Sequence, residues 1–209
     1  MIFKIYFCKW NRSAGKQKKM ESLIHEDKSF SNIKYSEKEK KKREFVNCTF
    51  TNCDFSNGVF PSNKFIDCVF TNCNMAMANL SHCQLNNVTF KDCKLLGINF
   101  SECIDFLFFV KFDRCVMDYC SFIRKKLLKT LFLNSSMKNV DFSECDLTKS
   151  IFSNSDLLNA VFDKTILKEV DFLTAYNYII DPEINIIKKA KFSLQGVAGL
   201  LNKYDIKIE

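Results

Sequence analysis

Proline, glycine and tryptophan are scarce in this sequence, and long apolar runs are absent. Two Pro, five Gly and one Trp stand against 22 Phe in 209 residues, a bias that suggests a core built from one repeated part. No apolar run approaches the length of a membrane span. The apolar opening MIFKIYFCKW has its positive charges behind it rather than ahead of it, unlike a signal peptide. We therefore expect a soluble, cytoplasmic protein with a single core.

Motifs for catalysis or cofactor binding are also missing. No Gly-rich phosphate loop occurs, and the only two histidines are His25, in the N-terminal segment, and His82. No two cysteines have the spacing of two to four residues that is typical of zinc sites. A catalytic group needs neighbours that perturb it within a pocket, and no such constellation is evident. We predict a protein that is not an enzyme and that binds no cofactor and no metal.

Cysteine, by contrast, is abundant and regularly placed. The chain has eleven Cys, and pairs such as Cys48 and Cys53, or Cys68 and Cys73, lie five residues apart. Ten of the eleven follow this five-residue rule, with Cys8 as the exception. A free thiol is a good small buried group. The pattern favours packing in a reducing cytoplasm over disulfide bonding.

Charge is unevenly distributed. Residues 1–44 hold 13 Lys or Arg and 6 Asp or Glu, whereas residues 45–209 hold 18 of each. The basic character therefore belongs to an N-terminal arm, above all to YSEKEKKKRE, and the rest of the chain is neutral. A basic run can bind nucleic acid or acidic lipid. Because no aromatic residues are interleaved, we favour a solvated face.

A large apolar residue recurs at every fifth position. The series runs without a gap from Phe45 to Phe100, breaks at SECIDFLFFVKF, and resumes two residues out of step from Phe112 to Phe172. Two residues before each large residue there is usually a small one. Neither a helix, with apolar positions every 3.6 residues, nor a strand, with a period of two, explains a period of five.

Units such as CDFSN, CNMAM, CDLTK and VDFLT resemble those of the pentapeptide-repeat family. The resemblance implies an all-β fold, a right-handed quadrilateral β-helix in which four repeats make one turn and the central and small side chains both point inward. Residues about twenty apart should then stack. One such column would be entirely Phe: Phe50, Phe70, Phe90, Phe112, Phe132, Phe152, Phe172 and Phe192.

The expected organisation has three parts. We expect a basic arm and cap over residues 1–44, the β-helix over 45–192, and a C-terminal helix with a short strand, Tyr204 to Ile208, over 193–209. This C-terminal order resembles the end by which Qnr-like quinolone-resistance proteins dimerise. The resemblance implies a homodimer. The apolar residues Phe192, Leu194, Val197, Leu201 and Ile206 offer more surface than an end cap needs, so we expect them at the interface. The alternative is a monomer whose helix only caps the rod.

Outward positions of the later repeats predict a contact surface. Residues on either side of a central Phe should point outward, which gives an apolar patch with a basic rim. The predicted surface consists of Leu128, Leu131, Leu133, Ile151, Leu173, Lys126 and Lys129. Its rim would favour an acidic partner. Lys125 falls at an inward small-residue position, so we expect a local bulge that lets its ammonium group reach water.

The function hypotheses follow from the resemblance and from the surface. Qnr-like proteins bind DNA gyrase or topoisomerase IV, which are type II topoisomerases, and shield them from quinolones. This chain differs from that group in its neutral repeat body and in having only a two-residue insertion, near Asp105 and Phe106, in place of long loops. The alternative is an interaction scaffold with an unidentified protein partner. A third hypothesis is nucleic-acid binding through the basic arm.

Overall fold

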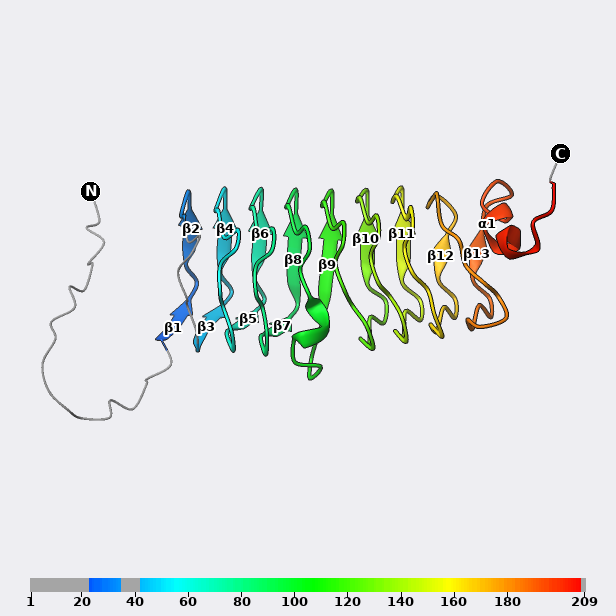
Figure 1. Cartoon of the computed structure of the whole chain (residues 1–209). Helices are drawn as coiled ribbons and strands as arrows, with labels where there is room; N and C mark the ends of the chain where they lie inside the picture. The colour runs from blue at the N-terminus through cyan, green and yellow to red at the C-terminus, as the bar shows by residue number, and fades with distance from the viewer. Residues whose placement is uncertain (1–22, 35–41, 208–209) are drawn as a thin grey trace, which may run out of the picture.

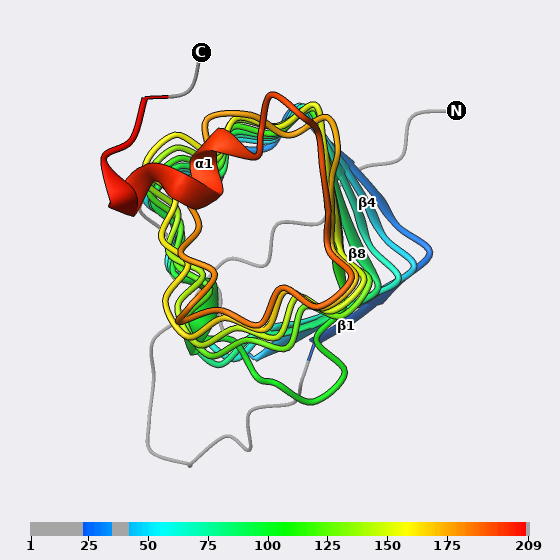
Figure 2. The same cartoon turned by 90° about the vertical axis from the view of Figure 1, so that its right-hand side faces the viewer.

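The computed structural model describes residues 23–34 and 42–207, which wind into a β-solenoid. Successive coils stack along one axis (Figure 1), and the view down that axis has a four-sided outline (Figure 2). We name the sides faces A to D in the order in which the chain runs through them, with Phe50 central on face A and Phe65 on face D. Within the described residues, no helix is long and apolar enough to cross a membrane.

Face A is a parallel sheet of nine strands. It consists of β2 (Ser29–Ser31), β4 (Thr49–Thr51), β6 (Val69–Thr71), β8 (Val88–Lys91), β9 (Val110–Asp113), β10 (Leu131–Leu133), β11 (Ile151–Ser153), β12 (Asp171–Phe172) and β13 (Lys191–Phe192). The register pairs Phe50 with Phe70, and Phe172 with Phe192. The predicted all-Phe column is therefore confirmed, including its last member.

Face D is a parallel sheet of four strands, β1 (Leu23–Glu26), β3 (Arg43–Val46), β5 (Lys64–Ile66) and β7 (Gln84–Asn86). Isolated parallel bridges continue it past residue 104, linking Lys126 to Asp146, Asp146 to Ile166 and Ile166 to Ile186. Faces B and C are held by similar bridges. A short 3-10 helix, η1 (Phe100–Glu102), precedes the phase break.

The corners explain the period of five. A residue with positive φ ends most sides, for example Asn52 at 53° and Asn72 at 52°. Asn tolerates this left-handed region better than most residues with a side chain. Its backbone amide continues the ladder, since Asn52 N donates to Thr71 O at 3.0 Å. The small inward residue that follows leaves room for the turn.

The core consists of ring stacks and thiols. Phe50 and Phe70 stack with centroids 4.5 Å apart and planes at 6°, an arrangement that repeats along the column. All ten described cysteines are buried and unpaired, as predicted. Burial raises the pKa of the Cys68 thiol to about 11 and that of Cys83 to about 12. Cys8 lies outside the described residues.

The solenoid begins earlier than the expected residue 45. β1 pairs in register with β3, and β2 pairs with β4, so residues 23–34 form two sides of a first coil rather than a cap. His25 stacks on Phe45 at 4.9 Å, and Phe30 stacks on Phe50 at 5.0 Å. Residues 1–22 and 35–41 of the predicted basic arm lie outside the described residues.

The C-terminal end differs from its prediction. The α-helix is shorter than expected, α1 (Ala198–Leu201), and it continues into the 3-10 helix η2 (Asn202–Tyr204). No strand includes Tyr204 or the described residues that follow it. The reason is a clamp: Lys203 Nζ contacts Asp181 at 2.8 Å and Glu183 at 2.6 Å, which fixes the end of the chain against the last coil.

Candidate interaction site

The phase break is a loop, residues 104–109, that leaves face D (Figure 2, in green). Both ends of the loop keep the ladder, because Ile104 N donates to Cys83 O at 2.8 Å and Phe109 N donates to Leu85 O at 2.9 Å. Between them a turn is closed by a hydrogen bond that Phe108 N donates to Asp105 O at 3.1 Å. At this level the chain runs outside the stack (Figure 2), and of the loop's side chains Phe108 is half-buried and packs against the core.

The loop carries apolar side chains into solvent. The side chain of Phe106 is 70% exposed and that of Leu107 is 52% exposed, and Ile104 is exposed as well. Phe106 is the one Phe classed as exposed in the described part of the chain. Exposed apolar residues clustered on a protruding segment usually mark a contact with another molecule.

Lys125 holds the base of this loop. The prediction of a bulge at Lys125 is wrong, because its side chain is only 2% exposed and fills the space that the loop leaves empty. Its Nζ donates to Asp105 Oδ1 at 2.6 Å and to the carbonyl oxygen of Cys103. It also lies 5.1 Å from the ring centroid of Phe108. The bulge belongs to the preceding coil, which supplies the counter-charge that a buried ammonium needs.

The predicted contact surface is only partly brought together. Leu131 pairs with Ile151 on face A, and both are half-buried. Ile151 in turn faces Asp171, and Leu133 faces Ser153, so polar residues interrupt the patch before the exposed Leu173. Lys126, Leu128 and Lys129 are exposed on face D. Sequence reasoning did not predict the loop at residues 104–109 as a contact site, and the only signal for it was the break in the five-residue phase.

The predicted dimer interface lies at the end of the rod. Leu194 is 91% exposed, and Val197 and Ile206 are also exposed. Phe192 and Leu201 are half-buried, since Phe192 stacks on Phe172 at 5.4 Å. Three of the five residues are thus open to contact.

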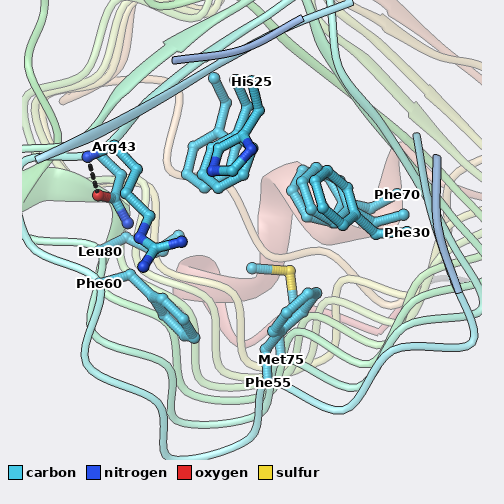
Figure 3. Close-up of a pocket in the computed structure, with 12 residues that line it drawn as sticks. His25, Phe30, Arg43, Phe55, Phe60, Phe70, Met75 and Leu80 are labelled. Atoms are coloured by element: carbon cyan, nitrogen blue, oxygen red, sulfur yellow. Dashed lines mark hydrogen bonds between the residues drawn. The ribbon is translucent and has the colours of Figure 1, made fainter. Parts of the chain in front are cut away.

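A pocket opens at the N-terminal end of the solenoid, where stacked rings of His25, Phe30 and neighbouring coils are visible (Figure 3). Burial, and then the charge of Arg43, lower the pKa of His25. Most of the lining consists of inward core side chains of the first coils, joined by Arg43 and Asn63, so we regard this pocket as an extension of the core. In the described residues, no group of three His, Cys, Asp or Glu side chains could hold a metal ion.

Parallel coils built from five-residue units define a β-solenoid repeat protein. The family model of the pentapeptide repeat region matches residues 43–106, and the model of eight pentapeptide repeats matches residues 141–172. These two segments therefore consist of pentapeptide repeats. No curated protein matches the sequence.

Three solved structures illustrate the similarity. A trypsin-treated form of QnrB1, a plasmid-mediated fluoroquinolone resistance protein, is 15% identical with a TM-score of 0.46, and the match covers 90% of this chain and 99% of that chain. Full-length QnrB1 is 16% identical with a TM-score of 0.42, covering 88% and 100%. HetL, from the cyanobacterium Nostoc and involved in heterocyst differentiation regulation, is 12% identical with a TM-score of 0.34, covering 81% and 86%.

Proposed function

We propose that this protein is a non-enzymatic interaction rod that binds a protein partner through the loop at residues 104–109. The observation that carries the proposal is the exposure of Phe106 and Leu107 on a loop whose base is fixed by the ion pair between Asp105 and the buried Lys125. Large apolar side chains held in water are unfavourable unless a partner covers them. A loop that is already ordered also loses less entropy on binding than a mobile one.

The specific partner we propose is a type II topoisomerase, DNA gyrase or topoisomerase IV, which the protein would protect from quinolones. The resemblance of the repeat units to those of Qnr-like proteins supports this choice. The alternative is another protein with an apolar pocket, for which the rod would be a scaffold. Ten unpaired thiols support a cytoplasmic location for either function.

A gyrase supercoiling assay in the presence of ciprofloxacin tests both parts of the proposal. We expect the native protein to restore supercoiling and the double variant Phe106→Ser, Leu107→Ser to require at least about tenfold more protein. The matched control is Leu158→Ser, an exposed Leu on face B. Circular dichroism would verify that each variant folds.

The possible outcomes test the identity of the partner and the position of the contact site separately. No protection by the native protein at large excess excludes a type II topoisomerase. Protection that the loop substitutions leave unchanged excludes the loop as the contact site. Loss of protection by Leu158→Ser as well would show that the effect is not specific to the loop.

A further inference from the structure

The outward positions of face D are arranged symmetrically about the loop. Four residues stack before it, Ile24, Glu44, Lys64 and Gln84. Four stack after it, Lys126, Asp146, Ile166 and Ile186. Two further columns run beside this one, through residues 26–86 and 128–188, and through the corner residues 27–87 and 129–189. The loop therefore occupies the middle level of a nine-level face.

The two halves of this face carry opposite charge. Before the loop, the three columns hold the acids Glu26, Asp27, Glu44 and Asp67 and a single cation, Lys64. After the loop, they hold two acids, Asp146 and Glu169, and six lysines: Lys126, Lys129, Lys149, Lys168, Lys188 and Lys189. All six lysines are exposed. A surface that is acidic at one end and basic at the other is complementary to its own inverted copy.

A twofold axis that lies in the interface at the level of the loop, parallel to the strands, brings four acid–lysine pairs into register. Such an axis reverses the order of levels and keeps each column opposite itself. It places Asp67 opposite Lys149, Lys64 opposite Asp146, Glu26 opposite Lys188, and Asp27 opposite Lys189. Ile24 meets Ile186, and none of the twelve facing positions brings like charges together.

We propose that face D binds face D of a second copy of this chain in an antiparallel dimer with twofold symmetry. The two loops meet at the centre, where Phe106 and Leu107 of each copy cover those of the other. The loops hold the two faces apart, and the long lysine side chains span the remaining gap to the acids. A parallel arrangement is disfavoured, since it would place the basic half against the basic half.

Lys64 already contacts Glu44 at 3.4 Å within the chain, whereas Asp67 and Lys149 remain available. Asp67 accepts a hydrogen bond from Asn87 Nδ2 at 2.6 Å, but the amide is neutral and leaves the carboxylate charge uncompensated. Lys149 Nζ lies 3.7 Å from Glu169, a distant contact between two exposed side chains. Exposed ion pairs are individually weak, so the apolar loops at the centre are needed for a stable dimer.

This inference goes beyond the proposed function and does not depend on the identity of the partner. It has one consequence for that function, because the dimer covers the same loop. Self-association and partner binding would then exclude each other, and the monomer would be the form that binds.

Sedimentation velocity of the full chain over a range of concentrations and salt tests the proposal. We expect a dimer at low salt that weakens as salt is raised. Asp67→Lys and Lys149→Asp should each raise the dimer Kd at least tenfold, and the double variant should restore it. Lys94→Asp, on face B, is the matched control and should leave the Kd unchanged.

Two results would overturn the proposal. One is a monomer at all concentrations and salt strengths. The other is a dimer that persists in both single variants but is abolished by Leu194→Asp, which would place the interface at the C-terminal end. Phe106→Ser provides a further check that keeps the charges intact, and it should also weaken the dimer.

Discussion

The earlier coils and the later coils of the solenoid fill the same inward position with different chemistry. On face B this position is occupied by Cys53, Cys73, Cys93 and Cys115, and then by Ser135 and Ser155. The side chain makes the same bond in both halves: Cys73 Sγ donates to Phe50 O at 3.4 Å, and Ser155 Oγ donates to Phe132 O at 3.1 Å. The position requires a small side chain with a donor, and either sulfur or oxygen satisfies it.

The outer surface also differs between the two halves, but there the fold does not restrict which side chain is present. The fold constrains the inward positions to a narrow set of side chains, whereas outward residues of face D change from acidic to basic across the loop. Since either charge is compatible with the same coil, the fold does not explain the change. The difference points to recognition by another molecule, and this is why we place function on the surface.

The largest effect we expect concerns the buried thiols, most of which lie in the earlier coils. Labelling of the ten buried thiols in the native protein should be slower than in urea by on the order of a thousandfold or more, because reaction requires unfolding. Time-resolved labelling followed by mass spectrometry measures this. Rapid modification of several thiols in the native protein would contradict the register of the solenoid.

The raised thiol pKa values also give a pH dependence. Folding holds the pKa of Cys83, for example, at about 12, above the ordinary value of 9.0. The folded state therefore favours the protonated thiol. The contribution of this thiol to the free energy of unfolding is complete below pH 9 and is lost as the pH rises toward 12. Urea titrations from pH 8 to 11 should show a falling free energy of unfolding.

The next effect separates core Phe from loop Phe. Phe132→Ala removes a fully buried ring from the column and should lower the free energy of unfolding by about 3–5 kcal/mol. Phe106→Ala removes an exposed ring and should change it by less than about 0.5 kcal/mol. Equal losses in urea denaturation would mean that the loop packs as part of the core.

A smaller effect should appear at the base of the loop. Asp105→Asn leaves the buried Lys125 ammonium without its counter-charge and should cost about 1–3 kcal/mol, moderated because the Asp105 side chain is 75% exposed. The double variant with Lys125→Met removes both charges and should recover part of the loss. A double variant less stable than Asp105→Asn would argue against the ion pair as the reason for the loop's position.

The smallest effect is expected when Cys and Ser are exchanged at the small inward position of face B. Cys73→Ser and Ser155→Cys each keep the size and the donor, so each should change the free energy of unfolding by less than about 1.5 kcal/mol. Cys73→Leu is the control and should cost more, because it overfills the corner. A large loss for Cys73→Ser alone would mean that the two halves are not equivalent inside.

The sequence was sufficient to predict the interior because each coil repeats one local rule. The period of five placed Phe50 and Phe192 in one column, and the parallel ladder confirms both. The first coil was missed because Lys40 falls at a central position, where the rule predicts a large apolar residue like Phe60. At the last coil the rule ends, and the clamp made by Lys203 replaces the expected strand.

The loop shows what such a rule cannot supply. The break in phase located the insertion, but the pairing of Asp105 with Lys125 joins two successive coils. It depends on the space left inside when one coil bulges outward. A local pattern describes neither that space nor the long side chain that fills it. The charge reversal on face D likewise becomes visible only once the columns are assembled.

The central claim is that the two halves of face D recognise each other between copies of the chain, and zero-length carbodiimide crosslinking with mass spectrometry tests it most directly. Asp67 and Lys149 are four coils apart, about 19 Å at the usual inter-strand spacing, so they cannot be joined within one chain. We predict Asp67–Lys149 and Asp27–Lys189 crosslinks in the dimer band, abolished by high salt. A dimer band whose crosslinks lie only among residues 192–207, or no dimer band at low salt, would contradict the account.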